Sequence, residues 1–109
     1  LRKFLERGGH QVTECASTQE VLQNLKSRSR RPDLVITDLW MPDDDGLSLI
    51  GLIKSSYAAL PVIAITGGAP RSPQGVSMDA AAEMGADRVL MKPVAMEELL
   101  KGVGNVIRR

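Results

Sequence analysis

The strongest constraint on the fold is an alternation between short apolar runs and longer segments with helical spacing. Short runs of mostly apolar residues occupy residues 33–38, 60–65 and 88–91. Apolar residues at three- and four-residue intervals indicate helices with one buried face over residues 47–57, 78–85 and 96–107. Buried strands that alternate with helices predict an α/β fold, a parallel sheet covered by helices on both faces.

The first twenty residues predict a helix, an edge strand and the start of a second helix. Leu1, Phe4 and Leu5 recur at helical spacing, and two glycines at positions 8 and 9 would end that helix. Residues 11–15 alternate between polar and apolar, which indicates a strand with one exposed face. Residues 17–20, STQE, match a capping box, so the second helix begins there.

Composition narrows the classes of function. The 109 residues fit a single domain, and 14 Lys and Arg against 13 Asp and Glu give a net charge of only +1. A domain that binds nucleic acid or a membrane surface usually carries a clustered basic excess, so neither partner is expected. No apolar run approaches the length of a membrane span, no signal peptide is visible, and the lone Cys15 suits a reducing compartment. We therefore expect a cytoplasmic protein.

Three different polar groups stand where three predicted strands end. Asp38 ends the first buried strand, Thr66 the second, and Lys92 follows the third. Right-handed crossovers place the carboxyl ends of parallel strands on one edge, where ligand chemistry gathers in such folds. A single polar residue at a strand end is usually a turn former, but a carboxylate, a hydroxyl and an amine together favour a functional site.

The motifs around these residues resemble those of CheY-like response-regulator receiver domains. DLVITDLWMPDDDG at residues 33–46 is similar to the phosphorylation strand and loop, and AITG at 64–67, MGAD at 84–87 and MKP at 91–93 match the later motifs in order. The resemblance covers essentially the whole chain. It implies a flavodoxin-like, doubly wound parallel sheet with strand order 2-1-3-4-5, strand 1 being absent from this chain.

The resemblance also implies a role for each site residue. Asp38 would accept a phosphoryl group from a histidine kinase or a phosphotransfer protein, Lys92 would pair with the acceptor carboxylate, and Thr66 would hydrogen-bond the phosphoryl group. Mg²⁺ would bind Asp38 and the backbone carbonyl of Trp40. The family often has a cis bond before the proline that corresponds to Pro93.

One departure from the family concerns the start of the chain. Receiver domains begin with an apolar strand that ends in an acidic pair, and this chain opens with Leu1 inside the first helix. The remaining acidic Mg²⁺ ligands are thus absent from the chain, and we expect Mg²⁺ binding only in an intact domain. We expect residues 1–109 to be a single receiver domain truncated at its N-terminus. In the alternative, another chain fills the gap, as in a domain-swapped dimer.

Two further departures concern switching. The switch aromatic of the family lies three residues before the lysine, and Val89 stands there. A valine cannot perform an aromatic flip, so we expect helix and loop movements instead. The segment over residues 67–75 is longer than in compact members and could form a flap or a partner-specific surface.

Other sites in the sequence are less favoured. Taking Gly46 as the EF-hand glycine puts Met41 and Leu52 at ligand positions, which excludes a calcium loop. The glycines after Thr66 lack the spacing of a phosphate-binding loop, and His10 is expected to be an exposed turn residue.

The sequence leaves two main alternatives for the function. The favoured one is a phosphoacceptor, not an enzyme, that switches an effector domain or output protein. The alternative is a degenerate receiver that acts as a phosphorylation-independent interaction module. A small phosphatase or nucleotide-binding enzyme is least favoured, because no general base is visible.

Overall fold

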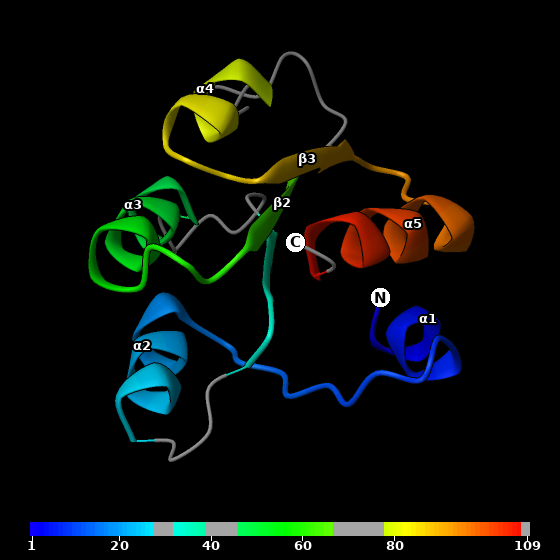
Figure 1. Cartoon of the computed structure of the whole chain (residues 1–109), viewed down its shortest axis with the longest axis horizontal. Coiled ribbons are helices and arrows are strands. Elements are labelled where there is room, and N and C mark those ends of the chain that lie inside the picture. The colour runs from blue at the N-terminus through cyan, green and yellow to red at the C-terminus, as the bar shows by residue number, and fades with distance from the viewer. Residues whose placement is uncertain (28–31, 39–45, 67–77, 108–109) are drawn as a thin grey trace.

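The structure is a computed structural model that describes residues 1–27, 32–38, 46–66 and 78–107. Its centre is a parallel three-stranded sheet of β1 (Val35–Asp38), β2 (Val62–Thr66) and β3 (Arg88–Met91), in the order β1-β2-β3 (Figure 1). β2 is buried along its whole length, whereas β1 and β3 are largely half-buried. The predicted α/β fold with a parallel sheet is confirmed.

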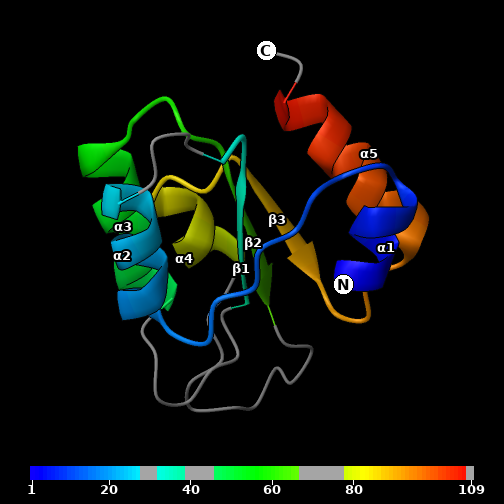
Figure 2. The ribbon, with the colours of Figure 1, turned by 90° about the horizontal axis from the view of Figure 1, so that it is seen from below.

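Helices cover both faces of the sheet. α2 (Thr18–Ser27), α3 (Gly46–Ser56) and α4 (Met78–Glu83) lie on one side, and α1 (Arg2–Arg7) and α5 (Met96–Ile107) lie on the other (Figures 1 and 2). The first core, on the α2–α4 side, contains Leu25, Leu49, Ile50, Ile53, Leu60, Val62, Ala64 and Ala81. The second core, on the α1–α5 side, contains Leu5, Ile63, Ile65, Leu90, Leu99, Val103 and Val106. Alternate residues of β2 thus enter opposite cores, as the period of two in a strand requires.

The edge strand expected over residues 11–15 does not form. The segment follows α1 without joining the sheet, and among the described residues no strand lies on the outer edge of β1. The alternation of residues 11–15 is compatible with a strand, but a strand also needs a hydrogen-bonded neighbour, which the described residues do not supply. The predicted strand order was 2-1-3-4-5. The sheet therefore contains strands 3, 4 and 5 of that order, as β1, β2 and β3.

Side chains tie this extended segment to α1 instead. Arg2 Nε lies 3.2 Å from Glu6 Oε2, and Arg2 Nη1 lies 3.7 Å from Glu14 Oε1. The hydrogen bond to Glu6, with the charges of Glu6 and Glu14, raises the pKa of the exposed Arg2 guanidinium. Val12 packs against the second core, so the segment is fixed by side chains rather than by a backbone ladder.

The helix ends follow the sequence signals. Ser17 Oγ accepts a hydrogen bond from the Glu20 amide (3.1 Å), and Glu20 Oε2 accepts one from the Ala16 amide (3.1 Å). The bond to Ser17 is the one that the predicted capping box requires, whereas the Glu20 carboxylate reaches the amide one residue before the cap. α1 ends before Gly9, whose φ of +87° favours glycine. No helix among the described residues has the length and apolar character that a membrane span needs.

The amino end of the sheet is closed by a polar network. Lys54 Nζ, at the end of α3, donates to the Leu60 carbonyl (2.9 Å) and lies 2.6 Å from Asp87 Oδ2. The same carboxylate oxygen accepts a hydrogen bond from the Val62 amide (2.8 Å), and the Asp87 amide donates to the Val62 carbonyl (2.8 Å). These bonds hold the start of β2 beside the turn that leads into β3.

Candidate functional site

The three predicted site residues lie at one edge of the sheet. Asp38 is the last residue of β1, Thr66 is the last residue of β2, and Lys92 directly follows β3. The parallel register pairs Asp38 with Ile65, and the Lys92 amide donates a hydrogen bond to the Thr66 carbonyl (3.0 Å). The carboxylate, the hydroxyl and the amine therefore gather at the carboxyl edge of the sheet, as the sequence predicted.

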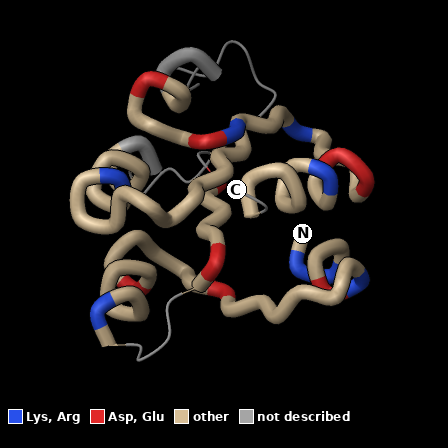
Figure 3. The backbone as a smooth tube through the Cα atoms, viewed as in Figure 1, with Lys and Arg blue, Asp and Glu red and all other residues tan. Residues whose placement is uncertain are grey.

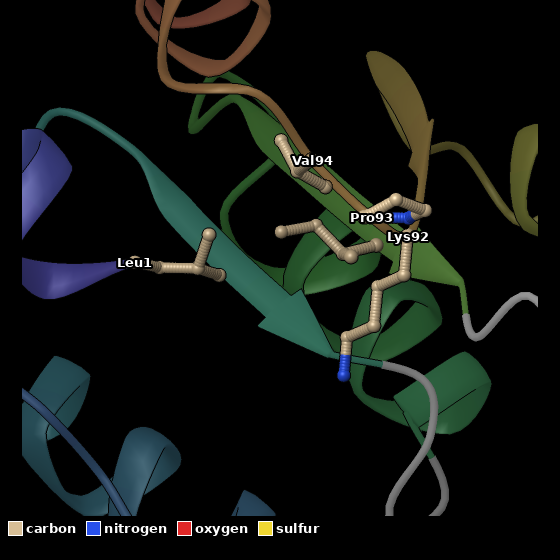
Figure 4. Close-up of a pocket in the computed structure, with 5 residues that line it drawn as sticks. Leu1, Lys92, Pro93 and Val94 are labelled. Carbon is tan, nitrogen blue, oxygen red and sulfur yellow. The ribbon is translucent and has the colours of Figure 1, made fainter.

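Asp38 and Lys92 form an ion pair across the width of the sheet. Lys92 Nζ lies 2.6 Å from Asp38 Oδ2, and 40% of the lysine side chain and 34% of the aspartate side chain remain exposed. Figure 4 shows the lysine side chain extending from β3 towards the end of β1. The pair is short enough for a charge-assisted hydrogen bond, yet the carboxylate remains accessible from solvent.

Thr66 approaches this edge from the other face of the sheet. The register partner of Asp38 is Ile65, which belongs to the second core, and Ile36 also packs there. Thr66 follows Ile65, so its side chain points to the opposite face, towards the first core. It is 2% exposed. The lysine and the threonine thus flank the end of β1 from opposite faces.

A hollow of about 540 Å³ adjoins the lysine on the α1–α5 side of the sheet. Leu1, Ile65, Lys92, Pro93 and Val94 line it, and Figure 4 shows Leu1 facing the loop that carries Pro93 and Val94. The peptide bond between Lys92 and Pro93 is cis, as the sequence resemblance implied. The sequence did not predict the hollow, because its lining comes from three separate segments and carries no local pattern.

Comparison with known proteins identifies the family. The family model for the response regulator receiver domain matches residues 1–104. The chain belongs to this family. It is a receiver domain of the two-component type, with the CheY-like fold.

Individual relatives agree with this assignment. The chain is 36% identical over 109 residues to the KDP operon transcriptional regulatory protein KdpE of Escherichia coli K12, and 35% identical to the response regulator MprA of Mycolicibacterium vanbaalenii. It spans 45% of the length of each of these two relatives. A solved response regulator receiver domain protein from Clostridium thermocellum is 30% identical, with a TM-score of 0.83, over 99% of this chain and 82% of that one.

Receiver domains of this family generally bind Mg²⁺ at an acidic pocket, and the described residues supply only part of such a site. No group of three or more potential metal ligands occurs among them. Asp38 offers one carboxylate, and its Oδ2 is already engaged by Lys92. Divalent cations prefer several oxygen ligands, so the described residues do not by themselves form a Mg²⁺ site. Trp40, expected to add a backbone carbonyl, lies outside the described residues.

The remaining sequence expectations fall on β3 and on the loops. Val89, the residue at the position of the family's aromatic, is half-buried and packs against the first core of this receiver domain. Its side chain is therefore part of the interior and cannot take the large rotation of an exposed ring. The segment over residues 67–75, expected to form a flap or a partner-specific surface, lies outside the described residues, as do the carboxylates at 43–45.

Proposed function

We propose that this receiver domain accepts a phosphoryl group on Asp38 from the phosphohistidine of a histidine kinase or phosphotransfer protein. The observation that carries the proposal is the Asp38–Lys92 ion pair of 2.6 Å. The pair lies at an accessible edge of the sheet, in a chain that belongs to the response regulator receiver family. A carboxylate held beside an ammonium group, and open to solvent, can meet a phosphorylated side chain of a second protein.

The transfer is a displacement at phosphorus. A carboxylate oxygen of Asp38 attacks the phosphorus, the bond between phosphorus and the donor imidazole nitrogen breaks, and the imidazole leaves with the electron pair of that bond. The product is an acyl phosphate on Asp38. Negative charge at the site increases during this step, so the reaction needs positive charge and hydrogen-bond donors more than it needs a general base.

Lys92 and Thr66 supply groups of the required kind. The Lys92 ammonium lies beside the carboxylate before transfer, and its long, partly exposed side chain can follow the phosphoryl oxygens afterwards. Thr66 offers a hydroxyl donor from the opposite face of the sheet. Both residues are fixed to the same edge through the hydrogen bond between the Lys92 amide and the Thr66 carbonyl.

The output would pass to an effector domain or a separate protein. Phosphorylation would shift an existing equilibrium at the face formed by α4, β3 and α5. Figure 3 shows charges of both signs on α1, α2 and α5, and the net charge of the chain is +1. Such a mixture favours a protein partner over direct contact of this domain with nucleic acid.

The test is phosphorylation of the full-length protein. It is incubated with Mg²⁺ and acetyl phosphate or phosphoramidate and analysed by intact mass beside Asp38→Asn. We expect a gain of one phosphoryl group that Asp38→Asn lacks. If the wild-type protein folds and gains no mass with either donor, the domain is a degenerate receiver that binds partners without phosphorylation.

A further inference from the structure

The outer edge of β3 has no strand beside it among the described residues. β3 is the last strand in the order β1-β2-β3, and Figure 1 shows it at one end of the sheet, with α4 and α5 to its two sides. Each strand can pair along two edges, and the ladder with β2 uses only one edge of β3. An extended segment of another chain can therefore add to the sheet at the outer edge.

Arg88 gives this edge a positive charge at the first residue of β3. It is the register partner of Ile63, which belongs to the second core, so its side chain lies on the α5 face of the sheet. Gly102 of α5 makes room for it, since a Cβ at Gly102 would lie 3.2 Å from Arg88 Cδ and 3.5 Å from Arg88 Nε. The arginine stem is thus packed against the helix, and this packing restricts the positions that the guanidinium group can take.

The guanidinium group has no acidic partner in the part of the chain that the structure describes. No ion pair joins Arg88 to a described carboxylate, and its neighbour Asp87 is engaged by Lys54 and the Val62 amide. A guanidinium group presents five N–H donors in a planar fork, which can bind a carboxylate through two parallel hydrogen bonds. The group that complements this position is therefore an Asp or Glu side chain of a partner.

The other end of β3 offers an apolar contact on the opposite face. Met91 is 51% exposed and belongs to neither core. It stands three positions after Arg88, so the two side chains point to opposite faces of the sheet. A strand laid along β3 places one residue opposite each of them, and cross-strand pairs of opposite charge or of apolar character stabilise such an addition.

From this arrangement we propose that the outer edge of β3 binds an extended segment of a partner protein, with an acidic residue opposite Arg88 and an apolar residue opposite Met91. The two partner residues stand three positions apart. β3 has only 4 residues, so the backbone hydrogen bonds are few and these two side-chain pairs decide which segment binds. Binding does not require a phosphoryl group on Asp38, so the inference is independent of the proposed function.

The test uses the full-length protein and two synthetic peptides. Acetyl-Val-Thr-Thr-Glu-Thr-Thr-Val-amide has a valine three positions to either side of its glutamate, so it fits in a parallel or an antiparallel orientation. The control peptide has glutamine in place of the glutamate. NMR follows the Nε–H signal of Arg88 and the methyl signal of Met91, assigned by Arg88→Gln and Met91→Leu. We expect both signals to shift with the glutamate peptide, and the glutamine peptide to bind about fivefold more weakly.

Arg88→Gln and Lys101→Met provide the matched variants, since each removes one positive charge and Lys101 is exposed on α5. Arg88→Gln should bind the two peptides equally, as judged from the Met91 signal, whereas Lys101→Met should keep the wild-type preference. Equal affinity of the wild-type protein for the two peptides, or no shift of either signal, overturns the inference without recourse to a variant. Loss of the preference in Lys101→Met also overturns it, because the peptide then responds to charge in general. Phosphorylation of Asp38, measured by intact mass, remains a separate result.

Discussion

Lys54 and Asp87 are 33 residues apart in the chain, yet Lys54 Nζ lies 2.6 Å from Asp87 Oδ2 at the end of the sheet opposite to Asp38. The lysine side chain is 20% exposed and that of the aspartate 13%, so the pair is mostly shielded from water. The aspartate also accepts a hydrogen bond from the Val62 amide. One carboxylate thus joins α3, β2 and the turn before β3.

Asp87→Ala should therefore destabilise the domain. The substitution leaves the Val62 amide and the Lys54 ammonium without this acceptor in a mostly buried place, and we expect the free energy of unfolding to fall by about 2 kcal/mol. Urea denaturation followed by circular dichroism measures the change. Asp33→Ala is the control, because Asp33 is exposed, and it should change stability by less than about 0.5 kcal/mol. Equal effects of the two substitutions would show that the network does not stabilise the fold.

Two glycines should respond to alanine with opposite signs. Gly85 has a φ of +110°, and a Cβ there would lie 2.9 Å from Lys54 Cγ. Gly85→Ala should therefore lower the free energy of unfolding by about 1–3 kcal/mol. Gly104 lies inside α5, and a Cβ would meet no described atom within 4 Å, so Gly104→Ala should raise it by about 0.5–1 kcal/mol. Denaturation midpoints that move in the same direction would contradict this assignment.

The capping box at the start of α2 gives a further stability prediction. Ser17→Ala removes the acceptor of the Glu20 amide and should cost about 1 kcal/mol. Ser55→Ala is the matched serine control, because the exposed Ser55 hydroxyl only bonds carbonyls within α3 and alanine is the better helix former. Thermal unfolding of both variants should show a lower midpoint for Ser17→Ala alone. If Ser55→Ala lowers the unfolding midpoint by a similar amount, the cap bond has no special role in stability.

The accuracy of the sequence predictions depended on how local each signal was. Asp38, Thr66 and Lys92 could be placed together because Asp38 and Thr66 end strands, Lys92 directly follows one, and parallel strands end at a common edge. The edge strand over residues 11–15 was wrong, since alternation describes the faces of a segment and not its partner. The Lys54–Asp87 pair was missed because nothing local links residues so distant in the chain.

The burial of the strands likewise depends on both the local sequence and the neighbours in the sheet. The apolar runs predicted strands covered on both faces, and β2, with neighbours on both edges, is buried at every position. β1 also begins with two β-branched apolar residues, but Val35 and Ile36 are only half-buried. Composition predicts which residues favour the interior, whereas the neighbours in the sheet decide how far each residue is covered.

The last prediction concerns the role of Lys92 in phosphoryl transfer. Lys92→Met keeps most of the apolar stem and removes the ammonium group that lies 2.6 Å from Asp38 Oδ2. The charge that develops on the phosphoryl group then lacks its counter-ion, and we expect phosphorylation by acetyl phosphate to slow by about 10- to 100-fold. The lower part of that range applies if solvent screens the partly exposed pair.

Lys101→Met, at an exposed position of α5, is the control for loss of one positive charge and should keep the wild-type rate. Rates of mass gain at fixed donor and Mg²⁺ concentrations distinguish the two. If Lys92→Met gains mass as fast as Lys101→Met, the ion pair orders the unphosphorylated site and does not assist the transfer.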